Sequence, residues 1–410
     1  MRKDCDYIVE KSIGQVRPDE AVKRALNGKS FSSGRLILVA AGKAAWSMAA
    51  AAYEVLGSRI DDGVVITKHG YSEGPIGDLK VREAGHPVPD ADTFSATREA
   101  LAVTEDLSAE DTVLFLVSGG GSALFEAPQC SEEELKDITS QLLASGADIV
   151  KMNTIRKRLS NVKGGKFARH CAPAKIYAIV LSDILGDPLD MIASGPAYPD
   201  SSTCADAQEI IEKFHIRLSA QAAQLMTVET PKTLDNVETV ITGSVRELCR
   251  AAAEACTELG YEPVFLTDCL DCEAADAGRF LGAIARSHQN TEKSLAFIAG
   301  GETVVHLNPN GHGIGGRNQV IALSAAPMIA GLAGTAVFSV GSDGSDGPCD
   351  AAGGFVDSET NDKLAAAGKK VDEILADNDA YHGLQTAGGL IMTGATGTNV
   401  NDVAVVLIKR

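Results

Sequence analysis

Two cationic side chains stand where an apolar run gives way to a helical pattern. Lys43 follows such a run in LVAAGKAAW, and Arg317 comes after a glycine loop in GGRNQ. A cation at a helix start opposes the helix dipole unless an anion also binds there. A planar guanidinium suits bidentate binding of a carboxylate or phosphate. Either residue alone is equally explained as a solvated side chain or an ion-pair partner, but two such junctions favour an anion site.

Glycine-rich segments flank these junctions and recur along the chain. Backbone amides at strand ends and helix starts can surround a phosphate. Any single glycine cluster is more often only a tight turn. Several clusters at strand ends together indicate an anion site. The clusters are SGGGSA (118–123), KGGK (163–166), AGGE (299–302), GHGIGGRNQ (311–319), GSDGSDGP (341–348) and TGATGTNVND (393–402).

The well-known phosphate and nucleophile motifs do not fit. The chain has Ile37 and Ala44 where a Walker A loop requires Gly and Ser or Thr. G-x-G-x-x-G occurs at 311–316, but it follows the turn-forming residues 308–310 and not a strand, so the dinucleotide fingerprint lacks its context. The serines of SGGGSA do not fit G-x-S-x-G, and no H-E-x-x-H spacing occurs. Covalent hydrolysis and zinc chemistry are therefore disfavoured.

Aspartates occupy the same kind of position as the two cations. Asp183 ends the apolar run KIYAIVLS and is followed by Asp187, a spacing that can hold Mg²⁺ through one or two carboxylates and waters. Asp343, Asp346 and Asp350 cluster in SDGSDGPCD, which matches an EF-hand calcium loop poorly. Asx-turns are the alternative explanation for about half of these aspartates.

The stretch 151–170, KMNTIRKRLSNVKGGKFARH, contains seven Lys and Arg residues and no acid. A solvated helix face is the usual explanation of a charge run, but in an acidic protein such faces normally mix signs. Phe167 is its only aromatic residue, so a single-stranded nucleic acid is not well supported. A small polyanion such as a phosphate ester fits this stretch better.

The elements that must position these residues alternate between short apolar runs and Ala-rich helical stretches. This alternation is typical of βαβ units and predicts an α/β fold with a mostly parallel sheet. The linker ETPKTLDN near 230–237 predicts two α/β domains, 1–236 and 237–410, with a ligand-binding cleft between them. The predicted strands are 36–41, 63–67, 112–118, 175–182, 238–243, 294–301 and 335–344. The predicted helices are 43–56, 93–107, 131–150, 246–259, 273–288 and 317–331.

Composition narrows the class of partner. The formal net charge is −18, from 37 Lys and Arg against 55 Asp and Glu, so long nucleic acids and anionic membranes are repelled. No signal-peptide pattern and no apolar run of about 18 residues is present. Nine scattered cysteines favour a reducing cytoplasm over a disulfide framework. Cys269 and Cys272 form a C-x-x-C pair without a second pair, which favours ordinary thiols over a zinc site.

Taken together, these segments resemble the glycerate 2-kinases of the MOFRL-domain family. The resemblance runs in order through nearly the whole chain. It rests on AAGKAAW, EAGHPVPD (83–90), LVSGGGSAL (116–124), MNTIRKRLSNVKGGK (152–166), LSDILGD (181–187), IASGPAYPD (192–200), GGETVV (300–305), GGRNQ (315–319), SDGSDGPCDAAG (342–353), NDAYH (378–382) and TGATGTNVND. It implies phosphorylation of D-glycerate at its 2-hydroxyl with ATP and Mg²⁺, in a cleft between a Rossmann-like N-terminal domain and a C-terminal MOFRL-type domain. Ala395 stands where Pro is common in the family.

The resemblance implies three catalytic residues by motif match, and the other site residues are expected from their residue types and positions. Lys43, Asp183 and Arg317 are expected to be catalytic. The expected substrate-binding residues are Arg156, Lys157, Ser118 and His86. The expected nucleotide or phosphate contacts are Gly119, Gly120, Gly121, Ser122, Gly300, Gly301, Glu302 and Asn318. The expected metal ligands are Asp183, Asp187 and Asp343.

Several alternatives stay open at this stage. Asp183 either orients the substrate hydroxyl as a base or binds Mg²⁺. The other activities considered are hydroxypyruvate reduction, a label that similar sequences have carried, and a kinase that forms 3-phosphoglycerate. A protein that binds anions or nucleotides without turnover is a third class. The expected partners are D-glycerate and ATP, with no nucleic acid or membrane, and a homodimer is one assembly that we keep open.

Overall fold

The computed structural model describes residues 1–311 and 313–410, which form two compact units by their internal contacts. The parallel-sheet unit comprises Ala21–Ser182 and Asp187–Thr242. The mixed-sheet unit comprises Met1–Glu20, Asp183–Gly186 and Gly243–Arg410. The division predicted from the sequence instead groups residues 1–20 and 183–186 with the first domain. That division and the cleft stay predictions.

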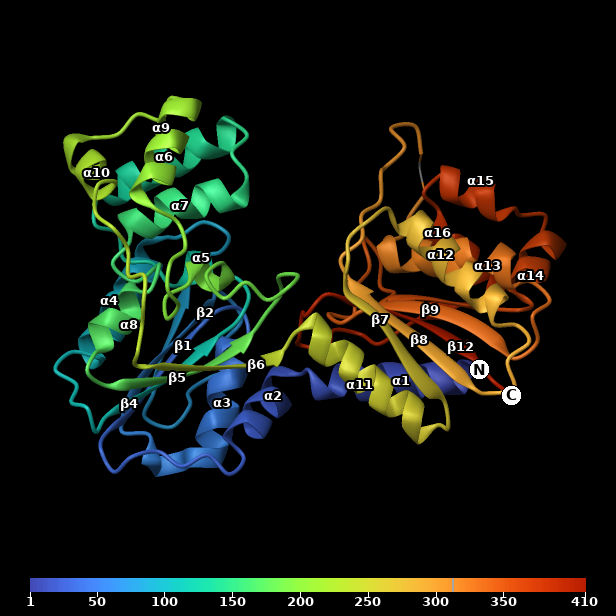
Figure 1. Ribbon diagram of the computed structural model, residues 1–410, viewed down its shortest axis with the longest axis horizontal. Coiled ribbons are helices and arrows are strands. Elements are labelled where there is room, and N and C mark those ends of the chain that lie inside the picture. Colours follow the sequence, from blue (N-terminus) through green and yellow to red (C-terminus); the bar gives the residue numbers. More distant parts are fainter. Residues whose placement is uncertain (312) are drawn as a thin grey trace. The chain divides into compact units, whose positions relative to one another are not determined.

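The parallel-sheet unit contains a sheet with the strand order β3-β2-β1-β4-β5-β6 (Figure 1). The pairs β1–β2, β2–β3, β1–β4 and β4–β5 are parallel. This is the strand order of Rossmann folds, in which ligands bind where the order reverses, between β1 and β4. The predicted Rossmann-like sheet is confirmed. Its strands are β1 (Leu36–Ala41), β2 (Asp62–Lys68), β3 (Lys80–Ala84), β4 (Thr112–Val117), β5 (Lys175–Leu181) and β6 (Val237–Gly243).

Helices complete this unit in two groups. One group packs on the sheet, with α3 against β1 and β2, α4 against β2 and β3, and α8 against β5. A second group, α6, α7, α9 and α10, has its own apolar core and forms a helical layer beside the sheet (Figure 1). The bounds are α2 (Pro18–Leu26), which contains the boundary between the units, α3 (Ala45–Leu56), α4 (Ala91–Val103), α5 (Gly121–Leu124), α6 (Glu132–Ala144), α7 (Ile149–Leu159), α8 (Lys166–Cys171), α9 (Cys204–Phe214) and α10 (Ala220–Leu225), with short 3₁₀ turns at Gly57–Arg59 and Ile192–Ser194.

The helix predicted over 131–150 is two helices, α6 and α7. Gly146 has φ +74° between them, a left-handed conformation that ends a helix. Asp148 then starts α7, because its side chain accepts a hydrogen bond from the backbone N–H of Lys151. The prediction of one long helix is therefore wrong at this turn.

The mixed-sheet unit contains a sheet with the order β11-β10-β9-β12-β8-β7. β7 and β8 are parallel, whereas β12 runs antiparallel to both β8 and β9, and β10 runs antiparallel to β9 and β11. Asp402, the first residue of β12, therefore lies opposite Gly301 and Gly341, the last residues of β8 and β9. The strands are β7 (Glu262–Leu270), β8 (Leu295–Gly301), β9 (Thr335–Gly341), β10 (Gly353–Asp357), β11 (Leu390–Ile391) and β12 (Asp402–Ile408).

Helices cover both faces of this mixed sheet (Figure 1). α1 and α11 pack together, and α11 contacts β7, β8 and β12. α12 and α13 pack together, and α13 contacts β9 and β10. The helices are α1 (Arg2–Gln15), α11 (Val245–Glu258), α12 (Ala274–Ser287), α13 (Arg317–Ile329), α14 (Thr360–Ala366), α15 (Val371–Ala376) and α16 (Ala380–Ala387).

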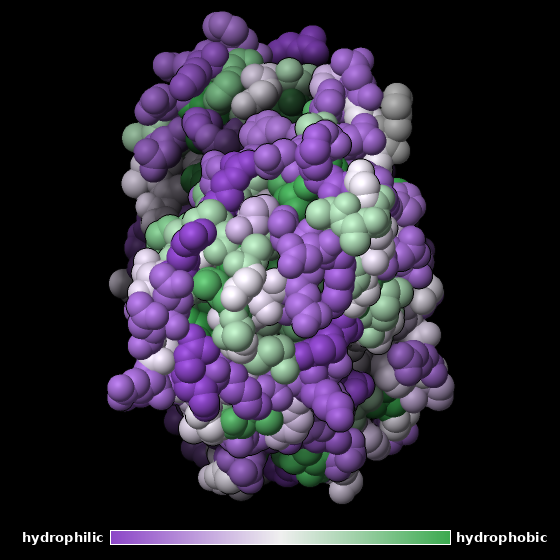
Figure 2. Space-filling model, turned by 90° about the vertical axis from the view of Figure 1, so that its right-hand side faces the viewer, coloured by the Kyte–Doolittle hydropathy of each residue, from purple (hydrophilic) through white to green (hydrophobic). Residues whose placement is uncertain are grey.

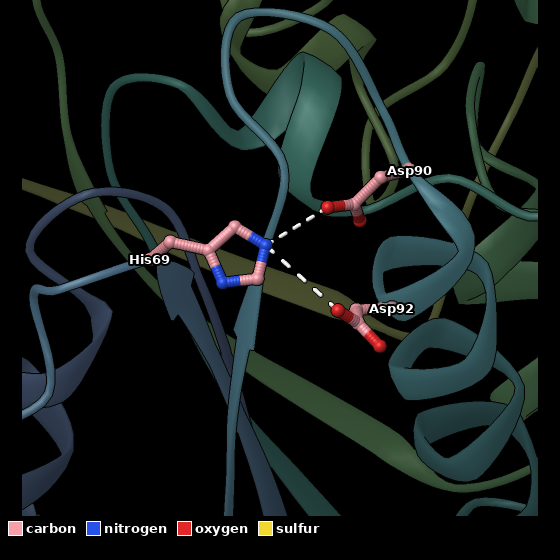
Figure 3. A group of neighbouring side chains, drawn as sticks. All are labelled: His69, Asp90 and Asp92. Atoms are coloured by element: carbon pink, nitrogen blue, oxygen red, sulfur yellow. Dashed lines mark hydrogen bonds and ion pairs between the residues drawn. The ribbon is translucent and has the colours of Figure 1, made fainter.

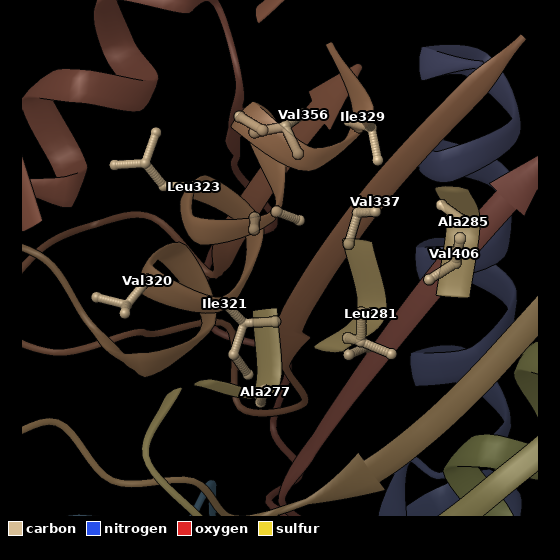
Figure 4. Packing of buried hydrophobic residues seen from close by; sticks show 14 of the residues in the cluster. Ala277, Leu281, Ala285, Val320, Ile321, Leu323, Ile329, Val337, Val356 and Val406 are labelled. Atoms are coloured by element: carbon tan, nitrogen blue, oxygen red, sulfur yellow. The ribbon is translucent and has the colours of Figure 1, made fainter. Parts of the chain in front are cut away.

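A continuous apolar cluster joins α12 and α13 to the sheet. Figure 4 shows Leu281 and Ala285 of α12 in this cluster together with Val337 of β9 and Val406 of β12. Much of the contact surface of both helices is alanine, which lets their backbones approach closely. This packing fixes the first turn of α13, where Arg317 lies.

The face of the molecule in Figure 2 is mostly hydrophilic, with apolar side chains in small separate patches. Such scattered apolar residues are normal on protein surfaces. Within residues 1–311 and 313–410, no helix is both long and apolar enough to cross a bilayer.

Candidate active site

The first group of predicted residues lies at the reversal point of the parallel sheet. The loop after β4 pairs with the loop after β1: the N–H of Lys43 donates to Gly119 O (2.8 Å), and that of Ser118 donates to Ala41 O (3.1 Å). The N–H of Ala44 donates to Ser118 Oγ (3.0 Å), so this hydroxyl serves the start of α3. The structure thus brings Lys43 and the SGGGSA loop together where a Rossmann-type sheet binds its ligand.

The side chain of His86 lies next to the same loop. A Cβ atom on Gly120 would lie 3.0 Å from His86 Cδ2 and 3.2 Å from Lys43 Cγ. Gly120 also has φ +86°, a conformation that favours glycine. Residue 120 must therefore be small, and it lies close to an imidazole and to a lysine side chain. This is a suitable arrangement for binding a small anion.

Ser122, at the other end of the loop, is held by two cations. Arg156 Nη2 and Lys163 Nζ donate to Ser122 O at 3.0 and 2.7 Å. Lys163 is fully buried and also donates to Phe125 O (3.0 Å). Burial lowers the pKa of Lys163 to about 8, although the Glu126 carboxylate opposes this shift. Arg156 is partly exposed and is the cation of the two that remains accessible to a ligand.

The cationic stretch 151–170 serves the fold more than a ligand. Lys157, predicted to bind substrate, is only 2% exposed and donates to Asp200 Oδ1 (3.0 Å). Arg158 is buried and donates to Thr154 O and Ser202. Lys166 Nζ donates to three backbone carbonyls at the end of α7. Because Lys157, Arg158 and Lys166 already have partners, these three do not support the polyanion-binding patch that the charge pattern indicated, and Arg156 is the residue of the stretch that stays in the proposed site.

The second group lies in the mixed-sheet unit, around a cavity of about 590 Å³. The ends of β8 and β9, the start of β12 and the start of α13 bring its polar residues together. Its lining holds Asp183, Glu302, Asp343, Asp346 and Asp402 against one cation among the described residues, Arg317. The sequence predicts four of these six residues as part of the site. It places Asp346 only in an acidic loop and Asp402 only in the glycine-rich motif 393–402.

Arg317 is fixed in the cavity by two carboxylates. Its Nε donates to Asp402 Oδ2 (2.5 Å), its Nη2 to Asp402 Oδ1 (3.3 Å), and its Nη1 to Glu302 Oε1 (2.8 Å). Burial raises the pKa of Asp402 to about 6, although Arg317 opposes this shift. Burial alone would lower the pKa of Arg317, but Asp402 and Glu302 raise it by more, so the guanidinium stays protonated. The guanidinium of Arg317 is therefore held in one orientation before any ligand binds.

Asp346 holds the first turn of α13. Gly316, at the N-cap position, has no side chain, and the carboxylate of Asp346 accepts from the backbone N–H groups of Asn318 (3.0 Å) and Gln319 (2.8 Å). It also accepts from both side-chain amides. Asn318, predicted to contact nucleotide, is buried and accepts from Ser339 Oγ (2.6 Å). Both residues line the cavity, but these hydrogen bonds position Arg317.

We expect Asp346→Ala to destabilise the mixed-sheet unit by about 2–4 kcal/mol, because buried N–H groups would lose a charged acceptor. Urea unfolding of the full chain measures this change. Asp350→Ala is the matched control, since exposed Asp350 accepts one hydrogen bond from Tyr381. It should cost less than about 1 kcal/mol. Equal costs for the two variants would show that Asp346 is not a structural cap.

Gly300 and Gly301, predicted to surround phosphate, have a packing reason to be glycine. A Cβ on Gly300 would lie 2.4 Å from Cys249 Sγ, and one on Gly301 would lie 2.2 Å from Leu270 O. β8 therefore approaches α11 and β7 too closely for any side chain. Glu302, the next residue, lines the cavity and holds Arg317.

Two of the three predicted metal ligands, Asp183 and Asp343, line the cavity. Asp343 Oδ1 accepts from the N–H of Ser345 (3.0 Å), which is the Asx-turn expected as the alternative. Asn401 Nδ2 donates to Asp183 O (3.3 Å) and anchors that segment. Asp187 lies in the parallel-sheet unit with φ +50°, and its metal role stays a prediction. Carboxylates of this kind match the oxygen ligands that Mg²⁺ prefers.

A further group of polar side chains, His69, Asp90 and Asp92, lies at the surface (Figure 3). His69 Nε2 is 2.8 Å from Asp90 Oδ2 and 3.8 Å from Asp92 Oδ2. Asp90 Oδ1 also caps α4 by accepting from the N–H of Thr93 (2.9 Å). An ion pair and a helix cap account for this group, so it is not assigned to a metal.

This pair predicts a pH effect on stability. The hydrogen bond with Asp90 raises the pKa of His69, and Asp90 stays ionised because its own pKa is lowered to about 2, where bonds from His69 and Thr93 outweigh burial. The imidazolium therefore stabilises the fold below about pH 6.5, and this contribution is lost as pH rises through the raised pKa. Melting temperatures of the wild type and His69→Gln should differ more at pH 5.5 than at pH 9. An equal difference at both values would contradict this assignment.

A family model described as "Domain of unknown function (DUF4147)" matches residues 4–227, and the MOFRL family model matches residues 295–402. The chain is 52% identical to a D-glycerate 2-kinase of Thermotoga maritima, over 100% of this chain and 98% of the relative. It is 40% identical to a glycerate 2-kinase of Pyrococcus horikoshii, over 94% of this chain and 90% of the relative. The crystal structure of a glycerate kinase from Thermotoga maritima matches with a TM-score of 0.94 and 51% identity, covering 100% of this chain and 99% of that one.

Proposed function

The chain belongs to the glycerate kinase family that combines DUF4147 and MOFRL domains, and on that premise we propose that it phosphorylates D-glycerate at the 2-hydroxyl with ATP. The single observation that carries this proposal is the cavity in which Arg317 is fixed beside carboxylates from three strand ends. A guanidinium and carboxylates together suit a phosphate that is complexed with a divalent cation.

Phosphoryl transfer requires alignment and charge neutralisation more than covalent catalysis. We assign Arg317 to the phosphates of ATP, and Lys43 with the SGGGSA loop to the anionic groups of glycerate and the transferred phosphoryl. Arg156 and His86 flank that loop and would bind the glycerate carboxylate. Two observations support these roles: Arg156 donates to Ser122 O, and His86 and Lys43 lie next to Gly120.

Asp183 and Asp343 are the residues that would hold Mg²⁺ in the cavity. When bound, Mg²⁺ supplies charge neutralisation and orientation of the phosphates. Asp183 has a second assignment, as the base that accepts the proton of the glycerate hydroxyl. The dependence of rate on Mg²⁺ concentration separates these roles, because loss of a metal ligand in Asp183→Asn raises the Mg²⁺ requirement and loss of a base lowers kcat at saturating Mg²⁺.

Two parallel assays of the purified chain test the activity. With ATP, Mg²⁺ and D-glycerate, we expect ADP release that depends on glycerate. With NADH and hydroxypyruvate, we expect no oxidation of NADH, since the dinucleotide fingerprint lacks its strand. NADH oxidation without ADP release would favour a reductase, and nucleotide binding without turnover would favour a binding protein.

A further inference from the structure

The cavity of the mixed-sheet unit has an apolar wall that the phosphoryl chemistry does not use. Val304 and Leu307 line this cavity, and they are 48% and 75% exposed. Single exposed apolar residues need no explanation, but two in one cavity with an otherwise mostly polar lining indicate a ligand surface. We propose that Val304 and Leu307 bind the base of the nucleotide, so that the cavity takes the nucleotide and not glycerate. This inference rests on the proposed kinase activity.

Hydrogen bonds to neighbouring segments hold the chain at Val304 and next to Leu307. The N–H of Val304 donates to Cys272 O (3.0 Å), and Val304 O accepts from the N–H of Ala274 (2.8 Å). Next to Leu307, the N–H of Asn308 donates to Asn378 Oδ1 (2.7 Å), and Asn308 Nδ2 donates to Ala376 O (2.9 Å). The backbone is thus fixed on both sides of the apolar wall, which is the preorganisation that a binding surface requires.

The spacing between the apolar wall and the guanidinium suits a nucleotide. Glu302, which holds Arg317, is two residues before Val304. An extended chain rises about 3.3 Å per residue, so the apolar wall begins roughly 7 Å from Glu302. A nucleotide likewise carries a flat, largely apolar base that a ribose separates from its phosphates. Glycerate has no apolar group that would bind Val304 or Leu307.

Charge favours the same assignment. The cavity is lined by five carboxylates and, among the described residues, one guanidinium. A free glycerate anion would be repelled there, whereas a nucleotide complexed with a divalent cation carries its own compensating charge. The loop at the end of β4 has the opposite character, because Lys43 lies next to Gly120 and Arg156 donates to Ser122 O. The cavity therefore favours a nucleotide complexed with a divalent cation, whereas the loop at the end of β4 favours a free anion such as glycerate.

Leu307→Asn tests the assignment in the full-length enzyme, because it replaces an exposed apolar side chain by a polar one of similar size. We expect the KM for ATP to rise about tenfold, with the KM for D-glycerate and kcat within about twofold of wild type. Leu143→Asn is the matched control, since Leu143 is 62% exposed on α6 in the parallel-sheet unit. It should change none of these constants. An unchanged KM for ATP in Leu307→Asn would overturn the proposal.

Calorimetry without glycerate measures how the base and the phosphates each contribute to nucleotide affinity. Leu307→Asn should bind Mg·ADP about tenfold more weakly than wild type and bind Mg·tripolyphosphate, which has no base, equally well. A parallel loss of both ligands would overturn the assignment of Leu307 to the base. If the wild type releases no ADP in the presence of glycerate, the kinase proposal fails, whereas the effect of Leu307→Asn on Mg·ADP binding tests the base site independently.

Discussion

Arg317→Ala is expected to lower kcat/KM for ATP-dependent glycerate phosphorylation by about 10³-fold, the scale on which single cations act in phosphoryl transfer. Arg317 is the only cation among the described residues that line the cavity, so no neighbour replaces its charge. Steady-state kinetics at saturating Mg²⁺ measures this loss. A decrease of only a few-fold would show that Arg317 does not contact the phosphates.

Two further variants separate this loss from misfolding. Arg317→Ala leaves the buried carboxylate of Asp402 without its partner, so its melting temperature must be measured beside its activity. Arg317→Lys keeps the charge but cannot form the fork with Asp402, and should recover only part of the activity. Arg250→Ala is the matched control, because Arg250 pairs with Glu247 and Glu254 on the surface of α11. Its kcat/KM should stay within twofold of wild type.

Lys43→Ala is expected to lower kcat/KM for glycerate by about 10²- to 10³-fold. The substitution removes the ammonium group but keeps the backbone hydrogen bond from residue 43 to Gly119 O, so the junction between β1 and α3 should remain intact. The melting temperature should therefore change little while activity falls. Initial rates over a range of D-glycerate concentrations measure the effect.

Lys80→Ala is the control for this second prediction. Lys80 lies on β3 of the same unit and pairs with Asp62, away from the glycine loop in sequence and sheet order. Its loss should leave kcat/KM within twofold of wild type. If Lys43→Ala and Lys80→Ala had equal activities, the reversal point of the parallel sheet would not be part of the active site.

The sequence predicted β1, β2, β4, β5, β6, β8 and β9, and missed β3, β7, β10, β11 and β12. β1 and β4 are buried at every residue, so they appear as continuous apolar runs. β3 (KVREA) and β7 are edge strands with polar, partly exposed residues, and β10 begins with two glycines. These three do not show a strand pattern. β12 is an apolar run that the sequence analysis did not assign as a strand; only its first residue, Asp402, belongs to the glycine-rich motif 393–402.

The candidate site was predictable where residue type decides the chemistry. Lys43 and Arg317 stand at expected helix starts in the sequence, and the structure places Lys43 between β1 and α3 and Arg317 at the first residue of α13. Burial was not predictable: Lys157 and Arg158 look like surface cations in the sequence, but Asp200, 43 residues after Lys157 in the chain, bonds Lys157 in the folded protein. The sequence did not indicate that Asp402 pairs with Arg317, because the two residues are 85 positions apart in the chain. They come together only when β12 pairs with β8 in antiparallel orientation.

The position of the new phosphate tests the central claim most directly. The purified chain is incubated with ATP, Mg²⁺ and D-glycerate, and the product is passed to enolase with no phosphoglycerate mutase present. If the chain phosphorylates the 2-hydroxyl, phosphoenolpyruvate forms without mutase, in proportion to the ADP released. If phosphoenolpyruvate forms only after mutase is added, or if no ADP is released, the chain does not act as the 2-kinase proposed.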